Sequence, residues 1–94
     1  MNSLGIHAIV SGVVQMVGYR WFTVKSAKEL ELTGWVKNLE DGTVEVKAFG
    51  QKGTLDAFIR QLRIGPIHSK VSDIKVKGIE YEPAYEKFNV KIKN

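Results

Sequence analysis

The spacing of apolar residues constrains this chain more than any other feature, because it switches in a definite order between a period of two and a helical period. A period of two is typical of a strand with one buried face, and a repeat of three to four residues is typical of an amphipathic helix. The pattern predicts strands over 4–11, 35–39 and 43–49, around Ile74 and Val76, and over 88–92.

Two helices are expected between these strands. The first spans 20–32 with Gly34 as its stop signal, and the second spans 55–62 and ends before Gly65-Pro66. Asp41-Gly42 favours a hairpin turn between the second and third strands. The resulting order, β-α-β-β-α-β with an extra short strand, predicts a mostly antiparallel sheet with two helices on one face. That architecture is an α+β, ferredoxin-like (split βαβ) sandwich.

The composition excludes several kinds of function. The chain has 94 residues and no cysteine, which excludes a disulfide framework, a cysteine zinc site and a thiol nucleophile. Its net charge of +4 is mild and favours the encounter with small anions. No apolar run approaches the ~18 residues of a membrane helix, and no leader pattern is recognised. We expect one domain over 1–94, in the cytoplasm, acting as a monomer without nucleic acid or membrane.

The junction between the first strand and the first helix, 12–18 followed by Arg20, is the strongest local sign of a site. The first turn of a helix presents unpaired backbone N–H groups, and the helix dipole favours an anion beside them. Arg20 opposes that dipole at a cost of about 0.3–1 kcal/mol, and no Ser, Thr, Asp or Asn precedes it as a cap. A bound anion would satisfy both the amides and the guanidinium. From the residues alone, a surface arginine whose stem covers the core is an equally good interpretation.

Two motifs resemble the signatures of the acylphosphatase family. The run from Val10 to Arg20, VSGVVQMVGYR, is similar to V-x-G-x-V-Q-G-V-x-[FY]-R. The run that begins at Gly34, GWVKNLEDGTVEV, is similar to G-[FYW]-x-x-N-x-x-x-G-x-V. Gly50 follows where the second signature ends, and the resemblance spans nearly the whole chain.

This resemblance implies hydrolysis of the carboxyl-phosphate bond of a small acyl phosphate to carboxylate and inorganic phosphate. It assigns Arg20 as the substrate-binding arginine and Asn38 as the catalytic residue whose side-chain amide holds the attacking water. It assigns the phosphate cradle to the backbone amides of Gln15, Met16, Val17, Gly18, Tyr19 and Arg20. A carboxylate leaving group, with a conjugate acid of pKa near ~4.3, departs without a general acid. We expect no metal and no cofactor, because this scheme requires neither and the sequence offers no obvious cluster of metal ligands.

Met16 departs from the first signature, which has glycine at this position. If the backbone there requires a positive φ, methionine costs about 1–2 kcal/mol of local strain. Its side chain could also narrow the cradle. We therefore expect reduced rather than absent turnover.

Other interpretations of the same residues stay open. The first is an anion-binding module of the same family type with little or no turnover. The second is single-stranded RNA binding on the open sheet face, which is disfavoured because the strand over 43–49 offers one aromatic residue and an acid. Asn38 alone would be read as a turn residue, and only its place in the second signature reverses that preference.

The remaining aromatic and histidine residues are assigned to structure. His7 is expected at the surface rather than in catalysis. The aromatic residues expected to pack in or beside the core are Trp21, Phe22, Trp35 and Phe58.

Overall fold

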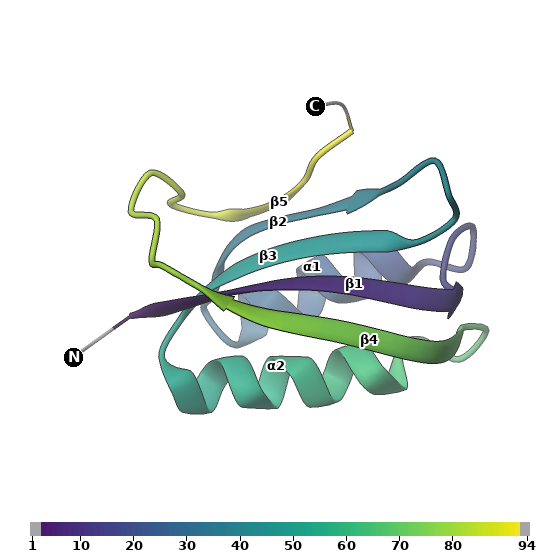
Figure 1. The fold of residues 1–94 in the computed structure, drawn as a ribbon, viewed down its shortest axis with the longest axis horizontal. Coiled ribbons are helices and arrows are strands. Elements are labelled where there is room, and N and C mark those ends of the chain that lie inside the picture. The colour runs from purple at the N-terminus through teal and green to yellow at the C-terminus, as the bar shows by residue number, and fades with distance from the viewer. Residues whose placement is uncertain (1–2, 93–94) are drawn as a thin grey trace.

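The computed structural model describes residues 3–92, which form one five-stranded sheet and two helices (Figure 1). In chain order the elements are β1 (Leu4–Val13), α1 (Tyr19–Glu29), β2 (Thr33–Asn38), β3 (Val44–Gly50), α2 (Lys52–Ile64), β4 (Lys70–Ile79) and β5 (Phe88–Val90). No helix among these described residues is long and apolar enough to cross a membrane.

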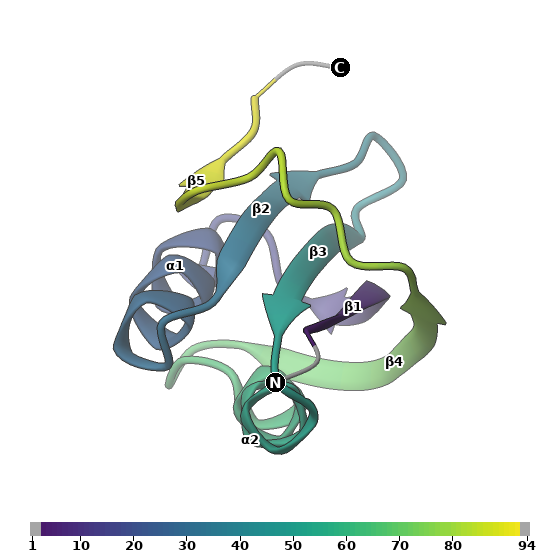
Figure 2. The ribbon, with the colours of Figure 1, turned by 90° about the vertical axis from the view of Figure 1, so that its left-hand side faces the viewer.

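The strands lie in the order β4-β1-β3-β2-β5. All neighbouring pairs are antiparallel except β2 and β5, which run parallel. β3 lies between β1 and β2, and its first residue, Val44, is in register with both Val10 and Asn38. Both helices cover the same face of the sheet (Figure 2). The predicted ferredoxin-like sandwich is therefore confirmed.

The core lies between the helices and this covered face. On β1, Ile6, Ala8 and Val10 are buried, whereas His7 and Ile9 between them are only half-buried. This alternation is the period-two pattern of the sequence, since successive strand side chains point to opposite faces. From the helices the buried residues include Tyr19, Ala27, Leu55, Phe58 and Leu62. Burial of these hydrocarbon surfaces is the main force that holds the two layers together.

β1 is longer than predicted, so the loop before α1 begins at Val14 rather than at Gly12. The ladder between β1 and β4 changes register between Ser11 and Gly12, as at a bulge, and Gly12 has φ 122°. A Cβ atom on Gly12 would lie 2.0 Å from the carbonyl oxygen of Lys70, so only glycine lets the strands pair here. A bulge interrupts the alternation of side chains, which is why the sequence pattern ends the strand too early.

α1 ends at Glu29, three residues earlier than predicted. The amide of Leu32 donates to Ala27 O at 2.9 Å and that of Glu31 to Lys28 O at 3.1 Å, which closes the helix with Glu31 at φ 58°. Glycine is the usual residue in that left-handed position, so a glutamate there gave no stop signal. Gly34, the predicted stop, instead lies inside β2.

β5 is also shorter than the predicted strand 88–92, because its pairing with β2 ends at Val90. The segment that connects β4 to β5 crosses the sheet face opposite the helices (Figure 2). There Tyr85 stacks on Phe49, with ring centroids 5.6 Å apart, and accepts a hydrogen bond from Trp35 Nε1 at 3.3 Å. This segment therefore covers part of the second face.

Candidate active site

The loop 14–18 delivers the chain from β1 to the start of α1. Gly18 adopts the left-handed conformation at φ 78° and caps α1 with no side-chain hydrogen bond. Its carbonyl oxygen accepts the first helical bond, from the amide of Phe22 at 3.0 Å. Among residues 3–92, no hydrogen bond takes up the backbone N–H groups of residues 15–20. This row of free donors at a helix N-terminus has the polarity that an anion requires.

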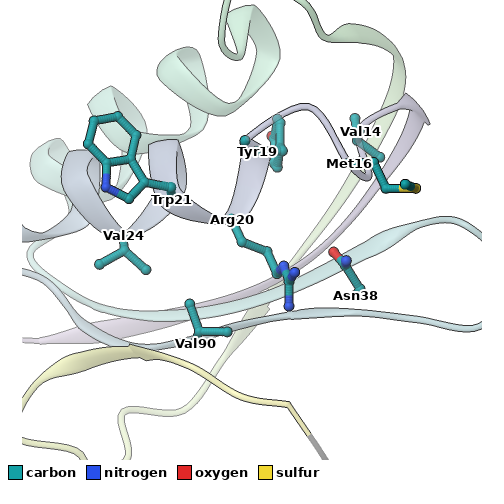
Figure 3. A pocket seen from close by; sticks show the side chains of 9 residues that line it. Val14, Met16, Tyr19, Arg20, Trp21, Val24, Asn38 and Val90 are labelled. Atoms are coloured by element: carbon teal, nitrogen blue, oxygen red, sulfur yellow. The ribbon is translucent and has the colours of Figure 1, made fainter.

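Met16 has φ 63°, so the position does require the left-handed conformation that the sequence led us to suspect. The conformation is strained for methionine by about 1–2 kcal/mol. The side chain is fully exposed, at 101%, and points away from Arg20 and Asn38 (Figure 3). It lies at the rim of the opening rather than between those two residues.

Gln15 joins this loop to the hairpin between β2 and β3. Its side-chain Nε2 donates to the carbonyl oxygens of Leu39 and Thr43, both at 2.8 Å. The sequence assigned Gln15 only a backbone role, because a local pattern does not show which distant carbonyl a side chain will reach. These two bonds hold the loop against the strand end that bears Asn38.

The hairpin itself is closed by its own hydrogen bonds. The amide and hydroxyl of Thr43 both donate to Asp41 Oδ1, at 3.0 and 2.6 Å. These bonds hold the pKa of the exposed Asp41 carboxyl below its usual range. The amide of Leu39 donates to Thr43 O at 2.9 Å, which fixes the chain directly after Asn38. Asn38 is therefore the last residue of β2, and hydrogen bonds within the hairpin fix the residues that follow it.

Arg20 and Asn38 face one another across a single cavity of about 380 Å³ (Figure 3). Arg20 is the second residue of α1 and Asn38 the last of β2, and both are half-buried. The ion pairs within the described chain do not include Arg20. Asn38 Oδ1 is buried and has no hydrogen-bond partner among the described residues. A buried acceptor without a partner is rare enough in folded proteins to indicate a group that receives a ligand.

The rest of the cavity lining is mainly apolar and includes Val14, Tyr19, Trp21, Val24 and Val90. Tyr19 is buried, its hydroxyl donates to Leu62 O at 2.7 Å, and burial raises its pKa above the usual value. The prediction that Trp21 packs in or beside the core is wrong, because this side chain is 69% exposed. The buried residues of α1 recur at helical spacing, as Tyr19, Thr23, Ser26 and Ala27 do, and Trp21 lies outside that stripe.

The other predicted residues lie away from this cavity. Trp35 and Phe58 are buried and Phe22 is half-buried, as expected. His7 is half-buried on the face opposite the helices, where its Nε2 lies 2.7 Å from Glu45 Oε2. Between residues 3 and 92, no three His, Asp or Glu side chains are grouped closely enough to hold a metal ion.

The open sheet face also lacks a free stacking surface over β3. Phe49, the aromatic residue of that strand, meets Tyr81 edge-on at 6.0 Å between ring centroids and lies under Tyr85. An RNA base stacks on an exposed aromatic face, which Phe49 does not offer. The RNA interpretation is therefore disfavoured.

Comparison with known proteins agrees with the two motifs. The model of the family described as Acylphosphatase matches residues 6–90. An acylphosphatase of Chlorobaculum tepidum is 49% identical over 90 residues, which cover 96% of this chain and 98% of that protein. The crystal structure of acylphosphatase from Bacillus subtilis is 38% identical with a TM-score of 0.90, over 94% of this chain and 98% of that one. The structure of an acylphosphatase from Coxiella burnetii is 41% identical with a TM-score of 0.91, over 96% and 94%. The chain therefore belongs to the acylphosphatase family.

Proposed function

We propose that this chain hydrolyses the carboxyl-phosphate bond of acyl phosphates at the cavity between α1 and β2. One observation carries the proposal: within residues 3–92, the guanidinium of Arg20 has no ion pair and the buried Oδ1 of Asn38 has no hydrogen-bond partner, and both line one cavity beside free backbone amides. The guanidinium and the backbone amides can donate hydrogen bonds to a phosphoryl group, and the oxygen of the Asn38 amide can accept one from a water molecule. The family and the fold support this reaction over anion binding without turnover.

Arg20 and the amides of residues 15–20 bind the phosphoryl oxygens. The planar guanidinium can hold two of those oxygens at once, and the amides add donors at the positive end of the α1 dipole. Charge spreads over the same oxygens in the transition state of phosphoryl transfer. Donors that are already in place therefore stabilise the transition state without reorganisation.

Asn38 positions the attacking water. Its Oδ1 accepts a hydrogen bond from the water and so directs a lone pair of the water oxygen toward phosphorus. The new P–O bond forms as the bond between phosphorus and the bridging oxygen breaks, and that electron pair leaves with the carboxylate. An amide is too weak a base to remove the proton, so the proton moves to a phosphoryl oxygen of the substrate. Positioning of this kind accounts for a large share of catalysis in such reactions.

The test is hydrolysis of benzoyl phosphate, followed by its ultraviolet absorbance in the presence of EDTA. We expect turnover by the chain and a fall in kcat of about 100- to 1,000-fold in Asn38→Ala, as when one such polar group is removed from other enzymes. Asn89→Ala is the matched control, because Asn89 is an exposed residue of β5 outside this cavity. It should keep the parent rate.

Two outcomes would count against this assignment. Equal loss of activity in Asn38→Ala and Asn89→Ala would remove the special role of Asn38. Binding of inorganic phosphate with no turnover by the parent chain would favour the anion-binding module instead. The single domain over 1–94, the monomeric state, the cytoplasmic location and independence of metal, cofactor and nucleic acid stay predictions from the sequence.

A further inference from the structure

The cavity extends beyond the residues assigned to the phosphoryl group and the water. Arg20 and Asn38 lie at one end, and Trp21, Val24 and Val90 line the other (Figure 3). Trp21 and Val24 are one helical turn apart on α1, so they share a face of the helix. Val90 belongs to β5, the edge strand that pairs with β2. Two separate elements therefore contribute to one apolar wall.

The size of the cavity exceeds what the reacting group needs. A volume of about 380 Å³ corresponds to roughly a dozen water molecules at ~30 Å³ each. A phosphoryl group has only a few non-hydrogen atoms and leaves much of that space unfilled. The volume instead falls at the lower end of the range of about 300–1,000 Å³ that is typical of small-molecule sites.

The apolar wall is open to a ligand. Trp21 is 69% exposed and Val90 is 41% exposed. Aromatic rings elsewhere in the described chain pack on one another, as Tyr19 does on Phe22 and Phe58 on Phe88, but Trp21 has no such ring partner. An indole that lines a cavity and lacks a packing partner offers a flat face on which a second ring can stack.

The chemistry of the substrate determines what reaches this wall. In an acyl phosphate the phosphoryl group is joined to the acyl carbon through a single bridging oxygen. When Arg20 and the loop amides hold the phosphoryl group, the acyl group is therefore held next to it, within reach of the apolar half of the cavity. The apolar half of the cavity provides hydrocarbon contacts and no charged side chain.

We propose that Trp21, Val24 and Val90 form an acyl-group subsite and that the preferred substrates are acyl phosphates with an aromatic acyl group. This inference rests on the proposed function and adds the substrate class to it. Trp21 stacks on the ring, while Val24 and Val90 confine its edge. None of the three touches the atoms that react, so they determine specificity through binding.

The first experiment compares benzoyl phosphate with acetyl phosphate, which differ only in the acyl group. We expect kcat/KM to favour benzoyl phosphate by about tenfold or more, a typical gain for an apolar group in an apolar pocket. Trp21→Ala should bring that ratio close to one, mainly through KM for benzoyl phosphate, because contacts made before and during reaction change KM. Val90→Thr, nearly the same shape, should lower the ratio by about threefold.

Folding of the variants does not obscure this result. Alanine favours helices, so it suits the exposed position of Trp21 on α1. The control is Ile64→Ala, which removes a 74% exposed apolar side chain from α2, outside the cavity, and should leave the ratio unchanged. Arg20→Ala should instead lower kcat/KM for both substrates by a similar factor.

A second experiment separates the subsite from the reaction. Phenacylphosphonate and acetonylphosphonate carry a methylene in place of the bridging oxygen, so they bind without hydrolysis. Calorimetric titration should show tighter binding of phenacylphosphonate by about tenfold, and Trp21→Ala should abolish the difference. If this preference is found without turnover of any acyl phosphate, the subsite stands and the proposed function fails.

Three results would overturn the subsite. Turnover with no preference between the two acyl groups would leave the proposed function and remove the subsite. Equal loss for both substrates in Trp21→Ala would assign Trp21 a structural role. Concentration-dependent self-association that Trp21→Ala abolishes would assign this surface to contact between copies of the chain.

Discussion

The two helices begin under similar chemical conditions and lead to different outcomes. α1 follows β1 and α2 follows β3, which are neighbouring strands of the sheet. Neither helix has a side-chain cap or an acidic residue in its first turn. Both also have a basic residue there, Arg20 in α1 and Lys52 in α2. Only the start of α1 opens into the cavity described above.

The difference lies in how the chain reaches each helix. β3 passes into α2 through Gln51 alone, in an extended conformation at φ −81° and ψ 154°. β1 passes into α1 through residues 14–18, where Met16 and Gly18 both have positive φ. Lys52 forms an exposed ion pair with Asp56, at 3.1 Å between Nζ and Oδ2, whereas Arg20 has no ion pair within the described chain. An uncapped helix start is therefore shared by both helices, and the curled loop and the unpaired arginine distinguish the start of α1, where we propose that the phosphoryl group binds.

The charge at the two helix starts gives the largest contrast. Arg20→Met should lower kcat/KM for benzoyl phosphate by about 100- to 1,000-fold, because a donor to the transition state is lost while the stem length is kept. Lys52→Met, the matched change at α2, should stay within twofold of the parent. Steady-state kinetics measures both, and a comparable fall in Lys52→Met would show that overall positive charge, not the α1 site, matters.

A glutamine precedes each helix, Gln15 before α1 and Gln51 before α2. Replacing them should give the second largest contrast, in stability and in rate. Gln15→Leu removes two hydrogen bonds to the hairpin, which should lower the free energy of unfolding by about 1–3 kcal/mol. Its kcat/KM should fall by about tenfold as the loop shifts relative to Asn38. Gln51→Leu should change stability by less than about 0.5 kcal/mol, since no cap bond is lost. Urea unfolding measures both changes in stability. Equal losses in Gln15→Leu and Gln51→Leu would show that the two hydrogen bonds of Gln15 do not stabilise the loop.

The smallest effect is expected at Met16. Met16→Gly relieves the left-handed strain but adds backbone entropy, so stability should rise by about 0.5–1 kcal/mol. Because the side chain points away from Arg20 and Asn38, kcat/KM should rise by less than about fivefold, the factor that 1 kcal/mol represents. Glu31→Gly, at φ 58° in the turn that follows α1, should give the same stability gain without any rate change. A tenfold faster Met16→Gly would show that methionine obstructs the cradle.

The sequence predicts the fold well because the two periods of apolar residues follow from the geometry of strands and helices. Two motifs whose spacing is local supply the candidate residues for binding and reaction, and the structure places Arg20 and Asn38 in one cavity. Prediction from the sequence fails where a local pattern is overruled by a distant contact. The bulge at Gly12 depends on the carbonyl oxygen of Lys70, and the hydrogen bonds of the Gln15 side chain depend on the distant hairpin.

The position of β3 between β1 and β2 has a kinetic consequence. The cradle follows β1 and Asn38 ends β2, so about 10 Å, two strand spacings, separates the supporting strands. They come into register only when Val44 pairs with Val10 on one side and with Asn38 on the other. The β1–β3 pairing joins residues far apart in sequence, and such contacts form slowly during folding. Recovery of activity on refolding therefore reports the completed sheet, and a partly folded chain with its helices already formed has no hydrolytic site.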